Sequence, residues 1–105
     1  MRKLVTVLAL AALAAGCRTL SLNYRQGAAA EMNQKYEEAV QYYQKAALDN
    51  PKEPVYRVAL VRARTAASLF FLQQARTLVA QNKRKEAEVN YQKALVFDPQ
   101  NYRAA

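Results

Sequence analysis

The 105-residue chain contains no histidine and no tryptophan, and it has only one cysteine, two glycines and three prolines. Without histidine and with a single cysteine, the chain can build neither a histidine–thiolate zinc site nor a Ser-His or Cys-His nucleophile. A glycine-rich phosphate loop is also absent, because Gly16 and Gly27 are the only glycines. The carboxylates at Glu37, Glu38, Glu86 and Glu88 fall on predicted helix faces that meet solvent. We therefore expect no catalytic residues, no metal and no cofactor.

The chain also lacks an apolar run of about 20 residues, the length that spans a bilayer. Its longest apolar run, Leu4 to Ala15, has only 12 residues and follows a short basic start. The only cysteine comes directly after it, in the order Ala14-Ala15-Gly16-Cys17. This resembles a bacterial lipoprotein signal with its lipobox, although Ala14 stands where leucine is commoner. The resemblance implies cleavage after residue 16 and acylation of Cys17. The alternative is an ordinary signal peptide with an incidental cysteine.

The resemblance also implies a location. Arg18, and not aspartate, follows the cysteine, which by the sorting rule of such lipoproteins favours an outer-membrane anchor facing the periplasm. Residues 17–23 would then be a short lipidated tether. The folded part is predicted to occupy residues 24–105.

An internal repeat organises that folded part. The segment KYEEAVQYYQKAALDNP (35–51) returns as KRKEAEVNYQKALVFDP (83–99). Both copies place small and aromatic residues on one helical face, and both end at proline, which stops a helix. The order Ala39-Tyr43-Ala46-Pro51, matched by Ala87-Tyr91-Ala94-Pro99, resembles the second helix of a tetratricopeptide (TPR) repeat. The resemblance implies an all-α fold of antiparallel helix pairs in a short TPR-like solenoid, with repeats at about 20–53 and 54–101.

The helices can be placed from their boundary signals. A first helix is expected at 24–32, with Ser21 or Asn23 as its N-cap. A turn at 33–34 then leads into the first repeated segment. The second copy begins 48 residues after the first, whereas a TPR repeat has about 34. We place the excess in a lengthened helix from about 55 to 80, about 40 Å long. A break at 65–68, making two helices, is the alternative.

Basic residues dominate the region between Glu53 and Glu86, which contains no acidic residue. The whole chain carries 16 Lys and Arg against 8 Asp and Glu, a net charge of +8. Such a block is typical of proteins that bind nucleic acid, anionic lipid or an acidic protein surface. Nucleic acid is not expected as a partner, because the predicted signal implies that the protein is exported. The alternative to a binding surface is a basic face that only meets solvent. The predicted basic patch consists of Arg57, Arg62, Arg64, Lys83, Arg84 and Lys85.

In a TPR array, the first helices of successive pairs line a binding groove. The predicted groove residues are Tyr24, Ala28 and Glu31 in the first pair and Leu69, Leu72, Gln73 and Arg76 in the second. More of these side chains are apolar than polar, which favours packing against a helix or domain of a partner protein. Some TPR proteins bind a C-terminal carboxylate with Lys and Asn residues at set positions of these helices, and those residues are absent from this sequence. Capture of an acidic C-terminus is therefore not expected.

Two functions follow from these resemblances. The first is a membrane-tethered TPR scaffold that binds a protein partner, in a secretion or pilus (secretin) assembly of the envelope. The second is an anchor, because the lipobox, short tether and lengthened helix with RVALVRARTAAS (57–68) resemble the N-terminal region of secretin-type outer-membrane proteins. Pilotins are a neighbouring interpretation, as is a general adaptor for an acidic partner or anionic lipid.

The last helix carries more apolar surface than its partner helix is expected to cover. Its apolar residues are Tyr91, Leu95, Val96 and Phe97. A solenoid normally covers such a surface with another repeat or a polar cap. We therefore predict that the segment 21–105 by itself self-associates through this helix or is only marginally folded, and that downstream sequence or a partner stabilises it.

Overall fold

The computed structural model describes residues 20–101, which form helices α2 (Leu22–Met32), α3 (Tyr36–Asp49), α4 (Pro54–Ala80) and α5 (Arg84–Phe97). No β-strand occurs within these residues. The predicted all-α class is confirmed. The predicted signal peptide at 1–16 and the acylation site Cys17 lie outside the described residues.

Helix α2 begins at Leu22, two residues before the predicted start, because Ser21 is its N-cap. The Ser21 hydroxyl accepts a hydrogen bond from the backbone N–H of Tyr24, with a donor–acceptor distance of 3.0 Å. The backbone N–H of Ser21 itself donates to the phenol oxygen of Tyr56, at 2.8 Å. The start of α2 is thereby joined to the first turn of α4. Of the two N-caps considered, Ser21 is the correct one.

The turns before the two repeated segments have the same backbone geometry. Gln34 and Asn82 occupy equivalent positions and adopt φ angles of 59° and 61°. In each turn the next amide reaches back to the preceding helix, Lys35 to the carbonyl of Ala30 at 2.9 Å and Lys83 to that of Leu78 at 2.8 Å. These bonds satisfy carbonyls that the helix end would otherwise leave free. The sequence repeat is therefore also a repeat of local structure.

Helix α4 runs unbroken for 27 residues, which corresponds to about 40 Å. Pro54 lies in its first turn, where the missing N–H costs no hydrogen bond. The alternative break at 65–68 is wrong. The Thr65 hydroxyl donates to the carbonyl of Val61 within the helix, at 3.2 Å. The polar side chain therefore bonds to its own helix and does not interrupt it.

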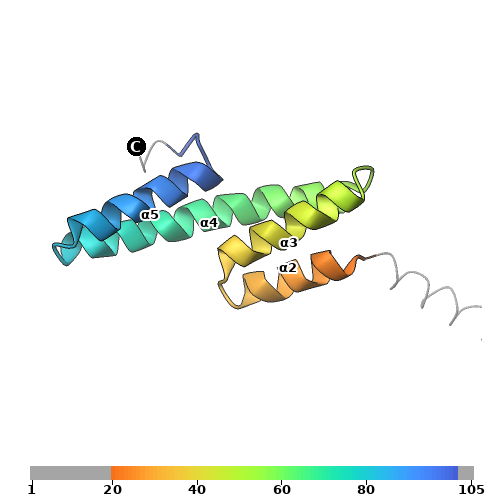
Figure 1. Ribbon diagram of the computed structural model, residues 1–105, viewed down its shortest axis with the longest axis horizontal. Coiled ribbons are helices and arrows are strands. Elements are labelled where there is room, and N and C mark those ends of the chain that lie inside the picture. Colours follow the sequence, from red (N-terminus) through yellow and green to blue (C-terminus); the bar gives the residue numbers. More distant parts are fainter. Residues whose placement is uncertain (1–19, 102–105) are drawn as a thin grey trace, which may run out of the picture.

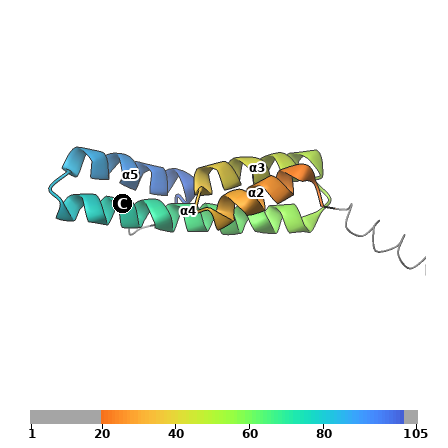
Figure 2. The same ribbon diagram turned by 90° about the horizontal axis from the view of Figure 1, so that it is seen from below.

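Helices α3 and α5 pack antiparallel to α4 along successive lengths of it, and α2 packs on α3 (Figures 1 and 2). The first turn of α3 and the last turn of α5 thus meet at the middle of α4. There the ring of Tyr36 lies 5.3 Å from Phe70, and Phe97 stacks on Phe71 at 5.7 Å. The predicted antiparallel pairing and the single lengthened helix are both present. The extra length of α4 places the second hairpin beyond the first along α4 and not beside it.

Alanines make these helix contacts close. Eight of them are at most 1 % exposed: Ala39, Ala46, Ala59, Ala63, Ala67, Ala75, Ala87 and Ala94. A small side chain at a crossing lets two helices approach, and larger residues fill the remaining space. Tyr43 has this role in α3 and is fully buried. The repeat positions predicted to form the interfaces, Ala39 and Ala46 with their equivalents Ala87 and Ala94, all lie in the core.

The C-terminal end of α5 is better covered than the sequence suggested. Leu95 and Phe97 are half-buried and pack against the core, whereas Val96 is 74 % exposed. Phe97 is covered by its stacking on Phe71 of the long helix. The prediction of a largely uncovered apolar end is therefore correct for Val96 and wrong for Phe97.

Candidate functional site

The structure does not bring the predicted groove residues together. Tyr24 of α2 packs on Tyr56, with ring centroids 5.6 Å apart, and Glu31 pairs with Arg62 at 3.0 Å. Both partners lie in the N-terminal half of α4, whereas the other predicted groove residues, 69–76, lie in its C-terminal half. The prediction placed α2 in one groove with residues 69–76, which lie near the end of α4. The lengthening of α4 instead leaves α2 beside its beginning.

The predicted groove residues also differ in exposure. Leu72 is 2 % exposed and belongs to the core, so it lines no surface. Tyr24 and Ala28 are half-buried, and Tyr24 lies between the rings of Tyr43 and Tyr56. Leu69, Gln73 and Arg76 are exposed on the C-terminal half of α4. These residues form no common groove.

The predicted basic patch separates into two groups. Arg57, Arg62 and Arg64 lie in the N-terminal half of α4, whereas the group at 83–85 lies at the turn beyond its other end. At 1.5 Å per residue, about 35 Å of helix separates Arg57 from the end of α4 at that turn. All six side chains are exposed, but the two groups cannot act as one patch.

Arg62 is committed to an ion pair between α4 and α2. Its guanidinium donates to Glu31 Oε1 at 3.0 Å, and the Tyr43 hydroxyl donates to the same oxygen at 3.4 Å. The hydrogen bond with Glu31 raises the pKa of Arg62, and burial raises the pKa of the Tyr43 phenol. Because more than half of the Arg62 side chain is exposed, the pair contributes little to the free energy of unfolding. Its effect is to orient α2 on α4.

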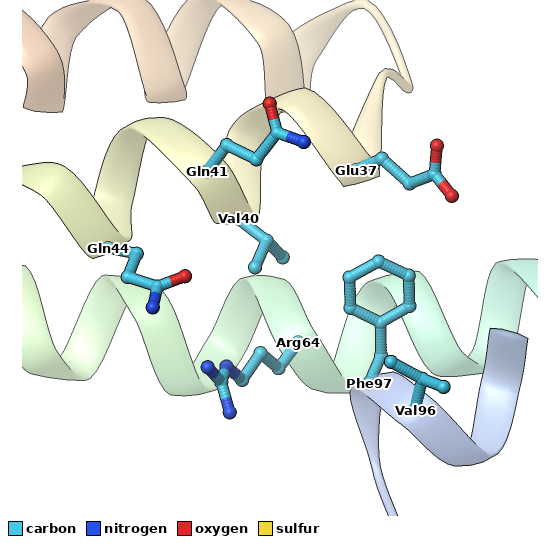
Figure 3. A pocket seen from close by; sticks show the side chains of 7 residues that line it. All are labelled: Glu37, Val40, Gln41, Gln44, Arg64, Val96 and Phe97. Carbon is cyan, nitrogen blue, oxygen red and sulfur yellow. The ribbon is translucent and has the colours of Figure 1, made fainter.

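A hollow of about 330 Å³ lies where α3, α4 and the end of α5 meet (Figure 3). Polar groups from α3 and α4 form its walls, and apolar side chains from α5 close one end. The lining residues are Glu37, Val40, Gln41, Gln44, Arg64, Val96 and Phe97. We call this hollow, together with the exposed face of α4 that carries Arg57, Val61 and Arg64, the α3–α4 trough.

Of the two charged side chains that line the hollow, Glu37 and Arg64, only Glu37 has an ion-pair partner among residues 20–101. Glu37 forms an ion pair with Lys93 of α5 at 3.3 Å, and the same ammonium lies 5.1 Å from the centre of the Phe71 ring. Arg64 forms no ion pair with any residue in the described range 20–101. Gln41 and Gln44 are exposed beside it on α3. Considering residues 20–101 alone, the lining of the hollow therefore offers one cation without an ion-pair partner and two amides, next to an apolar end.

The trough exists because α5 is displaced along α4. α5 is 14 residues long and covers the C-terminal half of α4, while α3 packs on another side of the N-terminal half, so the side of that half that continues the α5 contact carries no helix (Figure 1). The contact between Phe97 and Phe71 marks the point where α5 stops.

Part of the trough carried a signal in the sequence. Arg64 was in the predicted basic patch, and Val96 and Phe97 were predicted to be uncovered. Nothing singled out Gln41 or Gln44, which are ordinary polar residues on a helix. Their i, i+3 spacing places them on one face, but only the structure shows that α4 lies beside that face.

Two other hollows are less suited to a site. One of about 210 Å³ lies at the start of α3 against Phe70 and Phe71, and its polar wall comes almost entirely from α3 and the turn before it. The other, of about 420 Å³, is formed by residues 49–53 alone. Neither joins polar groups from different helices as the α3–α4 trough does.

Residues 20–101 contain no cluster of three or more Asp, Glu or Cys side chains that could hold a metal ion. In the same range, no helix is both long enough and apolar enough to cross a membrane. No protein-family model, curated protein or solved structure matches the chain.

Proposed function

We propose that this chain is a lipid-tethered helical scaffold that binds a partner protein in the bacterial envelope, within a secretion or pilus assembly. The observation that carries the proposal is the open α3–α4 trough, which is walled by two helices and closed at one end by a third. Surfaces of this shape bind helical segments of other proteins. The trough holds no pair of free acid and base groups, which favours binding over catalysis.

The tether supports the same proposal. Three residues, 18–20, separate Cys17 from Ser21, so an acylated Cys17 could lie at most four residue steps, or about 14 Å, from the N-cap of α2. Ser21 is bonded to Tyr56 at the first turn of α4. A lipid on Cys17 would therefore hold this end of the module close to the membrane, with the outer membrane as the proposed location.

A second candidate is the anchoring segment of a longer secretin-type outer-membrane protein. One observation favours it. Asn101 is only 9 % exposed, and its side-chain amide donates to Ser68 Oγ at 2.7 Å. The segment 98–101 that follows α5 is therefore held against the middle of α4, as an anchoring segment of a longer protein would need at its junction.

The test of the scaffold is photo-crosslinking in cells, with a photoreactive residue at Gln44 in the trough and a control at the exposed Gln26 on α2. We expect a product at Gln44 that contains an envelope protein identified by mass spectrometry, and none at Gln26. Mass spectrometry of the membrane form should show acylated Cys17, and Cys17→Ser should release the protein or leave it unprocessed. Unmodified Cys17 together with no product at any exposed position would overturn the proposal.

A further inference from the structure

We infer that the α3–α4 trough binds an acidic amphipathic helix of the partner protein, about four turns long. This inference rests on the proposed function and specifies the chemistry of the partner. It follows from three properties of the trough: its length, its charge and the distribution of its apolar residues.

The length of the trough matches a helix like α5. Residues 54–67 of α4, about 20 Å, contact α3 on one side and carry no helix on the trough side (Figure 1). The other half of α4 is covered by α5, which has 14 residues. A helix of similar length would fit in line with α5, with one of its ends at Phe97. It would cover residues 54–67 of α4, as α5 covers the other half.

The charge of the trough selects an acidic occupant. Arg57 and Arg64 lie seven residues apart and so share one face of α4, and neither forms an ion pair within residues 20–101. The nearest carboxylate in the hollow, Glu37, is already paired with Lys93. A Glu or Asp on the incoming helix would pair with Arg64, while the amides of Gln41 and Gln44 could bond to the same carboxylate.

The apolar residues select an amphipathic occupant. Val61 lies between Arg57 and Arg64 on α4 and is 64 % exposed, and Val96 at the end of α5 is 74 % exposed. Together with Phe97 they form an apolar strip along the trough. An incoming helix with Leu or Ile at i, i+3, i+4 and i+7 would bury this strip, and acidic residues beside that stripe would face the arginines.

The test measures binding of two designed helical peptides to the full-length protein in detergent, by fluorescence anisotropy. Both peptides carry the same leucine stripe, and they differ only in flanking Glu or Lys. We expect the Glu peptide to bind more tightly, and Arg64→Glu to weaken it by about tenfold. The same variant should improve binding of the Lys peptide. Arg76→Glu, an exposed change in the other half of α4, should alter neither affinity.

Several results would overturn the inference. They are equal binding of both peptides, no binding of either, or loss on Arg76→Glu without loss on Arg64→Glu. Two further results would identify a different occupant. Sedimentation of a dimer that Val96→Glu dissociates would assign the trough to a second copy of this chain. Arg64-dependent binding to phosphatidylglycerol vesicles, with neither peptide bound, would assign it to lipid.

The two proposals fail separately. If Cys17 is acylated and a partner crosslinks elsewhere on the surface, the scaffold remains and only the helix-binding trough is wrong. If Cys17 is unmodified but the Glu peptide binds with the expected Arg64 dependence, the trough is correct and the tether is wrong.

Discussion

The ring of Tyr43 lies against the backbone of Gly27, where α2 and α3 cross. A Cβ atom at position 27 would stand 2.7 Å from the Cδ1 and Cε1 atoms of that ring. The ring is fully buried and lies 5.6 Å from the ring of Tyr24, so it has little room to move. Glycine is therefore required by the close approach of the two helices.

Gly27→Ala should destabilise the protein although alanine is the better helix former. Overpacking costs about 1–3 kcal/mol, which exceeds the gain of about 0.5–1 kcal/mol in helix propensity. For a domain of this size each kcal/mol lowers Tm by about 4–8 °C. Thermal unfolding followed by circular dichroism measures the change, with the exposed Gln26→Ala as the control. An unchanged or raised Tm in Gly27→Ala would contradict the crossing seen here.

The buried bond between Ser68 and Asn101 should appear as a coupling energy. Ser68 Oγ donates to the carbonyl of Ala94 and accepts from the Asn101 amide, both at 2.7 Å. Each single change to alanine leaves a buried polar group without its partner and should cost about 1–3 kcal/mol. The double variant should cost about as much as the worse single one. Urea unfolding of the four proteins tests this, and simple additivity would mean that the bond contributes nothing.

Stability should fall at alkaline pH because of Tyr43. Burial raises the pKa of its phenol above the usual 10.0, and the Glu31 carboxylate acts in the same direction. The unfolded chain therefore loses this proton first as the pH rises. The contribution is fully present below about pH 10 and is lost as the pH rises through the folded-state pKa.

In Tyr43→Phe the free energy of unfolding should therefore decline less steeply above about pH 10 than in the wild type. The difference is at most about 1.4 kcal/mol per pH unit. Urea unfolding between about pH 9 and 11.5 measures it, and Tyr42→Phe, a half-buried neighbour on α3, is the matched control. Equal slopes in the wild type and Tyr43→Phe would show that this phenol does not contribute.

Ala87→Leu should loosen the second hairpin. Ala87 of α5 is 1 % exposed, so three added carbons would force the helices apart at a cost of about 1–3 kcal/mol. That is a large share of the stability of a small domain. Ala29→Leu, at an exposed position of α2, should change Tm little. If the two variants have the same Tm, Ala87 does not lie at the helix interface.

The sequence by itself determined the helices, their turns and the small residues between them. These features are local: a period of 3.6 places Ala39, Tyr43 and Ala46 on one face, and Pro51 and Ser21 mark helix boundaries within a few residues of their own position. The two copies of the repeat therefore fold alike, down to the left-handed residues Gln34 and Asn82.

Only the tertiary structure decided where each helix lies along α4. Periodicity says which face of α4 is buried but not which partner covers which length of it. That register depends on contacts between residues far apart in the chain, such as Tyr24 with Tyr56 and Phe71 with Phe97. The predicted groove residues do not come together because α2 contacts α4 at Tyr56 and Arg62, and residues 69–76 lie further along the helix. The trough around Arg64 arises for the same reason, since it is the length of α4 that α5, held at Phe71, does not reach.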